Sequence, residues 1–331
     1  MFLTTRVMPA PSGINEAPVS HRKRVRDKLL FFIPALRQKL MPRRNLLAGP
    51  FAGEFGWELM QWQGYVRVRH RNYQQVHVLT YPGRDYLYEG CQVHHHDIRL
   101  EQAGYDYGWL APAEARQMAQ SKATELELKD YDIFGPWLIC TQYHKRLLGP
   151  QEFRLFQERP LTDAILDLAF HFRAVRKQGP DQENKNYSPQ RAQQLVERCR
   201  EKGLSVCCIG HPDYAYCPPG CTDYRSVDLR GTVAAICSAR LVAGENSGPM
   251  HLANLCGKPT IVWAQDQWRI DYSLRWNPFR VRIYVAANNT SQPAPDLVSE
   301  AIGNALQDLR VKTRDFTQSV YTVPAQPIAY Y

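Results

Sequence analysis

The sequence predicts an α/β protein with two doubly wound, Rossmann-like domains, and three observations support this. The chain has 331 residues, enough for two cores of ordinary size. Its 44% hydrophobic and 22% charged residues are typical of folded proteins. In both halves, short apolar runs alternate with segments of helical periodicity, which favours parallel sheets connected by helices.

The first half opens as a strand–turn–helix–strand unit. Phe55, Leu59, Trp62 and Val66 recur at helical spacing, so one face of the predicted helix is apolar. In chain order we expect a strand at 46–49, a glycine-rich turn at 50–56, a helix to about residue 71, a strand at 76–80 and a helix near 113–128.

The second half shows the alternation more clearly. Ser188 followed by Pro189 is a typical helix start, and Gly203 is a typical helix end. We expect strands at 165–172, 204–210, 240–243 and 259–264, helices at 189–202, 232–238 and 248–256, and a final helix at 296–309 whose inner face includes Leu297, Val298, Ala301, Ile302, Ala305, Leu306 and Leu309. Four strands alternating with three helices predict a second doubly wound domain.

A polar stretch with two prolines, residues 150–160, separates these halves. The sequence therefore predicts four parts: a basic amphipathic N-terminal segment at 1–44, a Rossmann-like domain at 45–155, a second one at 156–310, and a C-terminal tail at 311–331.

The positive charge is concentrated at the N-terminus. Residues 1–44 hold ten Lys and Arg and two acidic residues, so they carry +8 of the net charge of +9. No apolar run reaches the ~20 residues that a membrane span needs. Because the apolar run Leu29–Leu36 lies among these charges, we expect residues 21–44 to contact an anionic membrane surface. The alternative is a helix docked on the protein with solvated charges.

Cysteine usage indicates a reducing compartment. Nine Cys in a long chain without a secretory signal favour a cytoplasmic location, with the basic segment at the inner face of the membrane. Cys217 and Cys221 are expected to be two free thiols in a turn rather than zinc ligands. His94, His95 and His96 alternate between faces of a strand, so they cannot converge on one ion, and no metal site is expected.

The stretch 244–251 leaves a strand and begins a helix, which places polar groups at the carboxyl edge of a sheet. A helix N-terminus offers unpaired N–H groups and a partial positive charge. Ser247 adds a hydroxyl and Gly248 permits close approach, a combination that suits a diphosphate, while Glu245 is placed to hold a ribose hydroxyl. The alternative is an ordinary helix capped by Asn246 or Ser247.

The segments 246–253 and 257–260, Asn-Ser-Gly-Pro-Met-His-Leu-Ala and Gly-Lys-Pro-Thr, resemble the donor-site signature of glycosyltransferase family 9, the heptosyltransferase-like enzymes of lipopolysaccharide synthesis. The family usually has Asp where this chain has Asn246. The resemblance continues around 275–279 and 281–285; it covers roughly residues 165–310 well and the first half weakly.

This resemblance implies the GT-B architecture, with two Rossmann-like domains facing a cleft. Residues 45–155 would then form the acceptor side and residues 156–310 the donor domain. It also implies a nucleotide-diphosphate sugar as co-substrate, with no cofactor and no metal in catalysis. The expected role is in lipopolysaccharide or polysaccharide biosynthesis. In the family a C-terminal helix commonly packs back toward the first domain, and the same is expected here. His251 matches the histidine of the signature and is a donor-binding candidate.

The catalytic base is expected at the first turn, where the family carries Gly-Asp. Here Trp57 follows Gly56, and Glu54 and Glu58 flank it. These carboxylates are four residues apart and would share a helix face if both were helical. One would accept the proton of the acceptor hydroxyl; we favour Glu54, because Gly53 frees its backbone. The alternative for each is a solvated carboxylate favourable to the helix dipole.

Positive groups for a departing diphosphate follow the strand at 165–172. Arg173, Lys177 and Lys185 would bind the donor phosphates, or be solvated, and His211 is a further candidate.

The sequence thus favours an inverting, metal-independent glycosyltransferase that moves a sugar from a nucleotide-diphosphate donor to a hydroxyl of a glycan or glycolipid. One alternative acts on nucleic acid, as in phage-type DNA base modification, since the basic segment is compatible with phosphates. Another is a non-catalytic binding protein on a GT-B scaffold, motivated by Trp57.

Overall fold

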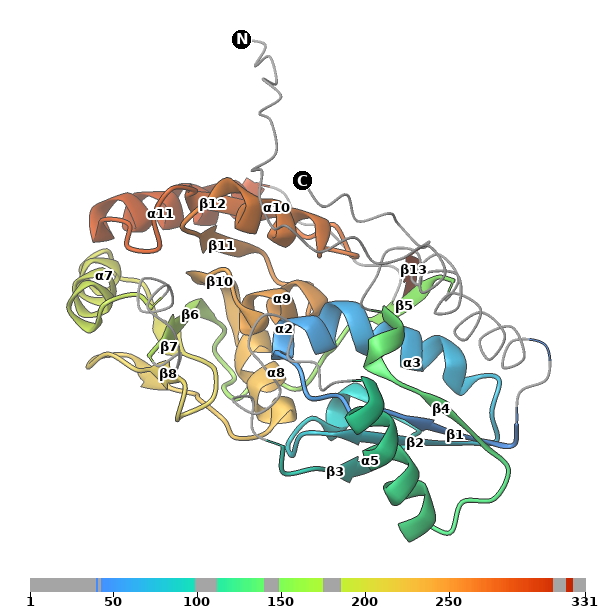
Figure 1. Cartoon of the computed structure of the whole chain (residues 1–331). Coiled ribbons are helices and arrows are strands. Elements are labelled where there is room, and N and C mark those ends of the chain that lie inside the picture. Colours follow the sequence, from blue (N-terminus) through green and yellow to red (C-terminus); the bar gives the residue numbers. More distant parts are fainter. Residues whose placement is uncertain are drawn as a thin grey trace, which may run out of the picture.

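A computed structural model describes residues 40, 43–98, 112–139, 149–174, 186–311 and 320–323. The expected membrane contact of residues 21–44 therefore lies almost wholly outside the described residues. Figure 1 shows two sheets, each with its own helices, that lie side by side.

The first sheet has the order β3-β2-β1-β4, and all its neighbouring strands are parallel. Every residue of β1 is buried, as in strands covered on both faces. The strands are β1 (Asn45–Ala48), β2 (Gln75–Thr80), β3 (Gln92–His95) and β4 (Tyr131–Phe134). The expected opening unit is confirmed, while β3 and β4 were not predicted.

The expected first helix is a composite. It consists of α2 (Phe55–Trp57), the π-helical segment η1 (Glu58–Trp62) and α3 (Gln63–His70). Leu59, Trp62 and Val66 are buried as predicted. The widened π turn was not predicted, and such turns are frequent at functional sites. The other helices in the described part of this half are η2 (Asp85–Leu87), α5 (Pro112–Glu125) and η3 (Pro136–Ile139).

The second sheet has the order β12-β11-β10-β6-β7-β9, again with parallel neighbours. Its strands are β6 (Leu166–Arg173), β7 (Val206–Cys208), β9 (Thr222–Asp223), β10 (Ala239–Glu245), β11 (Thr260–Trp263) and β12 (Ile283–Ala287); β8 (Ala215–Tyr216) pairs antiparallel with β6. If β8 is left out and the other six strands are numbered from 1 in chain order, the order read from β9 to β12 is 3-2-1-4-5-6, which is the Rossmann order. The predicted α/β fold with two doubly wound sheets is confirmed.

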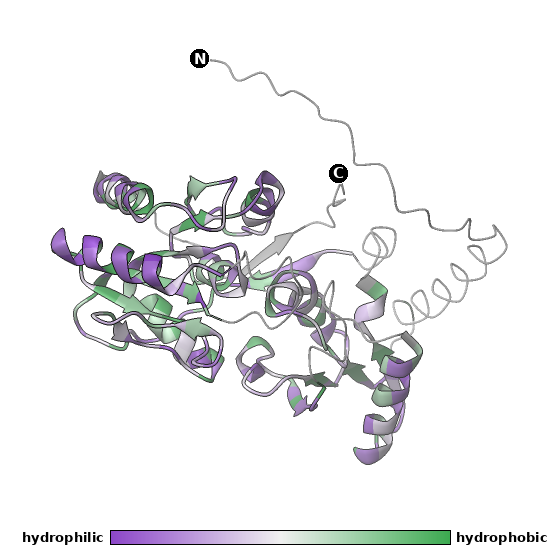
Figure 2. Ribbon diagram, turned by 60° about the vertical axis from the view of Figure 1, so that its left-hand side comes forward, coloured by the Kyte–Doolittle hydropathy of each residue, from purple (hydrophilic) through white to green (hydrophobic). Residues whose placement is uncertain are grey.

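Helices cover both faces of the second sheet. The helices α7 (Pro189–Glu201) and α11 (Pro295–Val311) share one hydrophobic cluster, and α8 (Leu229–Cys237) and α9 (Gly248–Leu255) belong to another. Figure 2 shows hydrophobic strands between helices of mixed hydropathy. The Ser188 hydroxyl caps α7 by accepting from the Arg191 N–H, as expected, and Gly203 (φ +76°) follows its end.

Two helix predictions in this half need correction. The helix expected at 232–238 begins at Leu229, because the Asp228 carboxylate accepts the Gly231 N–H and caps it earlier. Leu297 was expected on the inner face of the final helix, but its side chain is 48% exposed, whereas Val298 and Ile302 are buried. The inner stripe of α11 is therefore narrower than the sequence suggests. The helix α10 (Gln267–Arg275) was not predicted.

The stretch expected as a boundary contains a strand. Residues of β5 (Gln151–Arg154) pair antiparallel with β13 (Val320–Val323), so part of the expected tail is also a strand. The backbone of β5 passes close to α3, where a Cβ on Gly64 would lie 3.1 Å from the Glu152 carbonyl oxygen. The chain thus returns to the first half through β13, while α11, the last helix in the described part of the chain, packs on α7.

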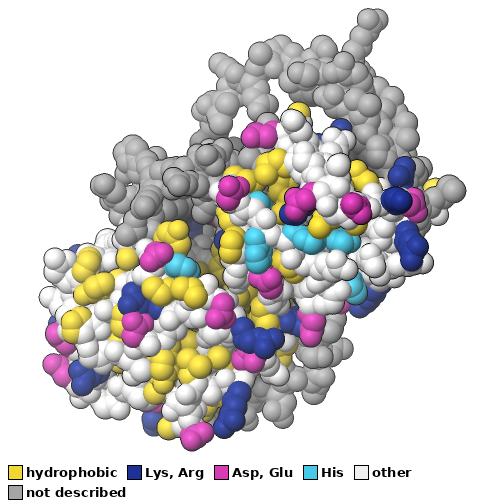
Figure 3. All heavy atoms as spheres, turned by 90° about the horizontal axis from the view of Figure 1, so that it is seen from below, with side chains coloured by type: hydrophobic (Ala, Val, Ile, Leu, Met, Phe, Trp, Pro, Cys, Tyr) yellow, Lys and Arg dark blue, Asp and Glu magenta, His cyan; other side chains and the backbone are white. Residues whose placement is uncertain are grey.

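The two halves are packed together by one hydrophobic cluster that draws residues from both. The Phe156 N–H donates to the Leu255 carbonyl at the crossing between them (2.9 Å). Seen from below, the halves form two lobes, and histidine side chains gather on one of them (Figure 3). Among the described residues, no helix combines the length and apolarity that crossing a bilayer requires.

Candidate functional site

The candidate site lies at the carboxyl edge of the second sheet, between β6 and β10. The strand order reverses between these two strands, and open α/β sheets bind ligands at such a point. Arg173 ends β6 and Glu245 ends β10. A shallow depression, with a cavity volume of only about 10 Å³, lies here, lined among others by Arg173, Glu245, Asn246, Trp263 and Arg269.

The helix α9 begins at this edge. Ser247 is the extended residue before it, and the Ser247 carbonyl accepts the N–H groups of Met250 and His251 (3.1 and 3.2 Å). The Ser247 hydroxyl does not cap the helix; it bonds with Nδ1 of the buried His171 (3.1 Å). Burial, and then the Arg173 charge, lower the pKa of His171 to about 3, so the imidazole is neutral. The alternative of an ordinary helix capped by the Ser247 side chain is therefore not observed.

Asn246 connects the end of β10 to α10. Its Nδ2 donates to the Arg269 carbonyl (2.6 Å) and to the Ser273 hydroxyl (2.5 Å). A carboxylate has no donor and would face the Arg269 carbonyl oxygen. The contacts of Asn246 thus give a structural reason for an amide at the position where glycosyltransferase family 9 usually has Asp.

Glu245 joins the end of β6 to the start of α7. Its Oε1 accepts the Tyr187 N–H (2.7 Å) and its Oε2 accepts the Arg173 N–H (3.4 Å). Burial raises the pKa of Glu245 to about 7, against the opposing effect of the Arg173 charge. The carboxylate retains lone pairs for a hydroxyl, so its predicted ribose contact remains a prediction.

Two guanidinium groups line the depression. Arg173 donates from Nη2 to the Asn246 carbonyl (3.3 Å), and burial lowers its pKa. Arg269, on α10, pairs with Asp266 (3.0 Å). We did not predict Arg269, although Asp266 as an N-cap and the aromatic residues 268, 272 and 276, four apart, are a helix signal. Lys177 and Lys185 lie outside the described residues.

The two histidine candidates lie at different places. His251 is buried, burial lowers its pKa to about 3, and its ring packs against Trp276 (4.9 Å between centroids). His211 follows Gly210 at the end of β7, and its Nδ1 accepts the Asp213 N–H (3.1 Å). The structure thus brings Arg173, Glu245 and Asn246 together around the depression, places His251 toward the first half, and leaves His211 on the neighbouring loop.

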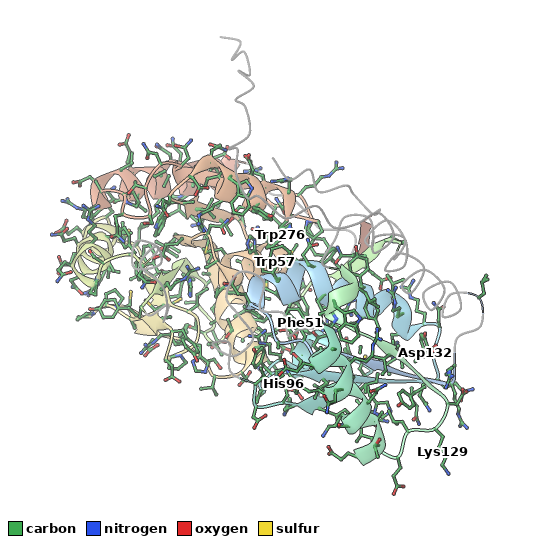
Figure 4. All side chains as sticks on the ribbon, viewed as in Figure 1. Phe51, Trp57, His96, Lys129, Asp132 and Trp276 are labelled. Carbon is green, nitrogen blue, oxygen red and sulfur yellow. The ribbon has the colours of Figure 1, made fainter. Side chains whose placement is uncertain are left out.

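The first half meets α9 at a contact between two glycines. A Cβ on Gly248 would lie 2.6 Å from Cδ1 of Phe55 and 3.3 Å from the Gly56 nitrogen. Trp57 packs edge-on against Trp276 (5.3 Å between centroids), and the two residues lie next to each other in Figure 4. The start of α2 therefore lies at the start of α9. Trp57, which stands where the family carries Asp, is a packing residue between the halves.

Glu58 is enclosed within the first half. Its carboxylate accepts from the Thr80 hydroxyl (2.5 Å), the Tyr88 hydroxyl (2.6 Å) and the Arg84 guanidinium, and its side chain is 0% exposed. Burial and the Glu58 charge raise the pKa of Tyr88. The Arg84 guanidinium lies over the Phe55 ring (4.9 Å), which connects this network to the contact with Gly248.

Glu54 has a different environment. It is the extended residue before α2 (φ −61°, ψ 146°), and its side chain is partly exposed. Its carbonyl accepts the N–H groups of Trp57 and Glu58. Because Glu54 is not helical, the condition for a shared helix face with Glu58 is not met, and the two carboxylates differ in access to solvent.

The three consecutive histidines have separate partners. His94 stacks on His77, His95 lies beside Asp85, and His96 lies against the Phe51 carbonyl (2.7 Å). Cys217 and Cys221 are free thiols, as predicted. Within the described ranges, no three His, Cys, Asp or Glu side chains are grouped so that they could hold a metal ion.

The fold and site define an α/β protein of two Rossmann-type sheets with a basic crevice at the switch point of the second. The chain is similar to three glycosyltransferase structures. One is the iron-containing dodecameric glycosyltransferase TibC of enterotoxigenic E. coli, with 14% identity over 67% of this chain and a TM-score of 0.44. Another is a family 9 glycosyltransferase of Veillonella parvula, with 11% identity, 80% of this chain and 98% of that chain covered, and a TM-score of 0.49. The third is the E. coli ADP-heptose lipopolysaccharide heptosyltransferase II, with 12% identity, 81% of this chain and 99% of that chain covered, and a TM-score of 0.49. The chain spans 58% of the length of TibC. No family model and no curated protein matches the sequence.

Proposed function

We propose that the protein is an inverting, metal-independent glycosyltransferase. It transfers a sugar from a nucleotide-diphosphate donor to a hydroxyl of a glycan or glycolipid, and no cofactor takes part. The observation that carries this proposal is the family 9-like segment 246–260, which forms a strand end, a turn and a helix start at the switch point of the second sheet, beside Arg173 and Arg269.

In this proposal the diphosphate lies at the start of α9. The backbone N–H groups there and the guanidinium groups of Arg173 and Arg269 stabilise the charge that develops as the bond from the anomeric carbon to the diphosphate oxygen breaks. Gly248 remains a donor-binding candidate through its backbone only, because the space beside its Cα is filled by Phe55 and Gly56. Glu245 holds a ribose hydroxyl. Lys177, Lys185 and His211 remain further donor-binding candidates.

The acceptor hydroxyl attacks the anomeric carbon from the opposite face, which inverts its configuration, and Glu54 accepts the hydroxyl proton. Glu54 is preferred over Glu58 because the Glu58 carboxylate is buried and already accepts three donors. Residues 45–155 supply the acceptor side and residues 156–310 the donor side. A cytoplasmic location at the inner face of the membrane, held by residues 21–44, belongs to the same proposal.

The decisive test is nucleotide release from UDP-, GDP- and ADP-sugars by the full chain, measured with and without EDTA. We expect release from at least one donor, unchanged by EDTA, and a loss of at least about 100-fold in Glu54→Gln. Glu300→Gln, the same chemical change on the exposed face of α11, should keep full turnover. If no donor is consumed, the GT-B binding-protein alternative gains; if Glu54→Gln is fully active, the base is assigned wrongly.

The acceptor class is tested by binding at matched salt to anionic vesicles and to duplex DNA. Contact of residues 21–44 with a membrane predicts binding to vesicles over DNA, and a variant lacking residues 1–39 should lose it. Preference for DNA would favour the nucleic-acid alternative.

A further inference from the structure

A second cavity, of about 130 Å³, lies on the outer flank of α3 in the first half. Arg67 and His70 of α3 line it, with Arg71 just after that helix. Leu87 of η2, Cys91 in the turn that follows and Glu152 of β5 complete the wall. None of these residues belongs to the proposed donor site or to the proposed catalytic groups. The cavity is therefore a separate feature of the first half.

The charges around this cavity are not balanced. Three guanidinium groups and two carboxylates lie at or beside its walls, and each carboxylate already has a guanidinium: Arg71 pairs with Glu152 (2.5 Å), and Arg154 pairs with Glu89. Among the described residues Arg67 forms no ion pair; Glu152 attracts its charge only at longer range, while it is paired with Arg71. The three guanidinium groups therefore exceed the two carboxylates by one positive charge.

The Arg67 guanidinium is held in place by neutral acceptors only. Its Nη2 donates to Oε1 of Gln63 and to the Leu87 carbonyl (3.0 Å each). Its Nε is buried and has no hydrogen-bond partner. Burial, and then the Arg154 charge, lower the pKa of Arg67 to about 10. Leaving a guanidinium desolvated without a counterion is costly, and the usual remedy is an anion with several acceptor oxygens.

The side chain is also fixed before any ligand arrives. The bonds to Gln63 and Leu87 hold the guanidinium in one position, so little side-chain entropy is lost on binding. His70, whose Nε2 lies 3.1 Å from the Gly90 carbonyl, is a second nitrogen-bearing side chain on the same helix face. Fixed donors in a small cavity favour a compact anion over an extended chain.

We propose that this cavity is a binding site for a small phosphate-class anion, held by Arg67 with His70 and Arg71 beside it. The anion is either free inorganic phosphate or the phosphate of a small monoester; the chemistry recognised is the same. The site is independent of the proposed transferase activity, so failure of one leaves the other standing.

The test is isothermal titration of the full chain with inorganic phosphate and, separately, with glycerol phosphate, at ionic strength held constant with NaCl. We expect saturable binding of at least one of them, and the arm that binds more tightly identifies the source of the phosphate. Arg67→Gln should weaken this binding at least tenfold. Arg67→Lys, which keeps the charge but loses the planar fork, should give an intermediate affinity.

Two controls separate this site from general charge effects and from the donor site. Arg310→Gln, the same change in charge at an exposed position of α11, should bind phosphate like the wild type. Arg173→Gln should also retain this binding. If neither ligand binds, or if Arg67→Gln and Arg67→Lys, shown to be folded by circular dichroism, bind as tightly as the wild type, the proposal is overturned.

Discussion

Replacing Asn246 by Asp restores the residue that glycosyltransferase family 9 usually has, yet we expect it to destabilise this chain. The Asn246 amide donates to the Arg269 carbonyl and to the Ser273 hydroxyl at 2.6 and 2.5 Å. In Asn246→Asp the Ser273 hydroxyl can turn and donate to the carboxylate, but the Arg269 carbonyl loses its donor and faces a carboxylate oxygen instead. A buried acceptor left without its donor costs about 1–3 kcal/mol, and because the two oxygens also repel each other we expect the upper part of this range, roughly 2–3 kcal/mol.

The change is measured by urea unfolding. With an m-value of about 3 kcal/mol/M, the midpoint should fall by roughly 0.5–1 M. Asn288→Asp is the matched control, since Asn288 is exposed and donates to Gln267, and surface changes of this kind stay within about 0.5 kcal/mol. If Asn246→Asp is as stable as the wild type, the amide does not make the contacts on which our account of this position rests.

Three further predictions concern stability. Gly248→Ala places a Cβ 2.6 Å from a Phe55 carbon, so it should separate the two halves and lower the thermal midpoint. Gly303→Ala in α11, where no atom lies within 4 Å, should instead raise stability by about 0.5–1 kcal/mol. Equal effects of the two substitutions would argue against the close contact at Gly248. Glu58→Gln leaves buried donors without a carboxylate and should cost about 3–5 kcal/mol in urea unfolding. If it costs no more than the exposed variant Glu300→Gln, the account of Glu58 as a buried carboxylate is wrong. Burial lowers the pKa of both His171 and His251 from 6.5 to about 3, so each resists protonation in the folded state and each should contribute a fall in stability of about 2 kcal/mol between pH 6.5 and 5. His171→Gln should remove the His171 share and leave that of His251; a pH slope unchanged from the wild type would contradict the burial of a neutral imidazole at His171.

The elements of the second half are largely predictable from the sequence, because their signals are local. The cap of α7 at Ser188, the buried face of that helix and the glycine after its end are all set within a few residues of one another. The apolar runs of β6 and β10 are likewise visible without knowledge of their partners. The errors in this half were at the exposed Leu297, at the start of α8, and in the helix α10, which was missed although Asp266 caps it.

Contacts between distant residues were not predictable. The pairing of β5 with β13 joins residues about 170 positions apart, and each strand has only four residues of mixed polarity. The enclosure of Glu58 depends on Thr80, Arg84 and Tyr88, which a sequence pattern does not connect to it. Trp57 shows the same limit, since its packing against Trp276 is set by the contact between the two halves.

The central claim is that the turn between β10 and α9 holds a nucleoside diphosphate beside Arg173. It is tested most directly by thermal shift of the full chain with UDP, GDP, ADP and CMP, because a ligand that binds only the folded state raises the unfolding midpoint. We predict that at least one diphosphate raises the midpoint while CMP does not, and that Arg173→Gln, compared with Arg310→Gln, loses this rise. If no diphosphate raises the midpoint, or if Arg173→Gln retains the full rise, the claim is wrong.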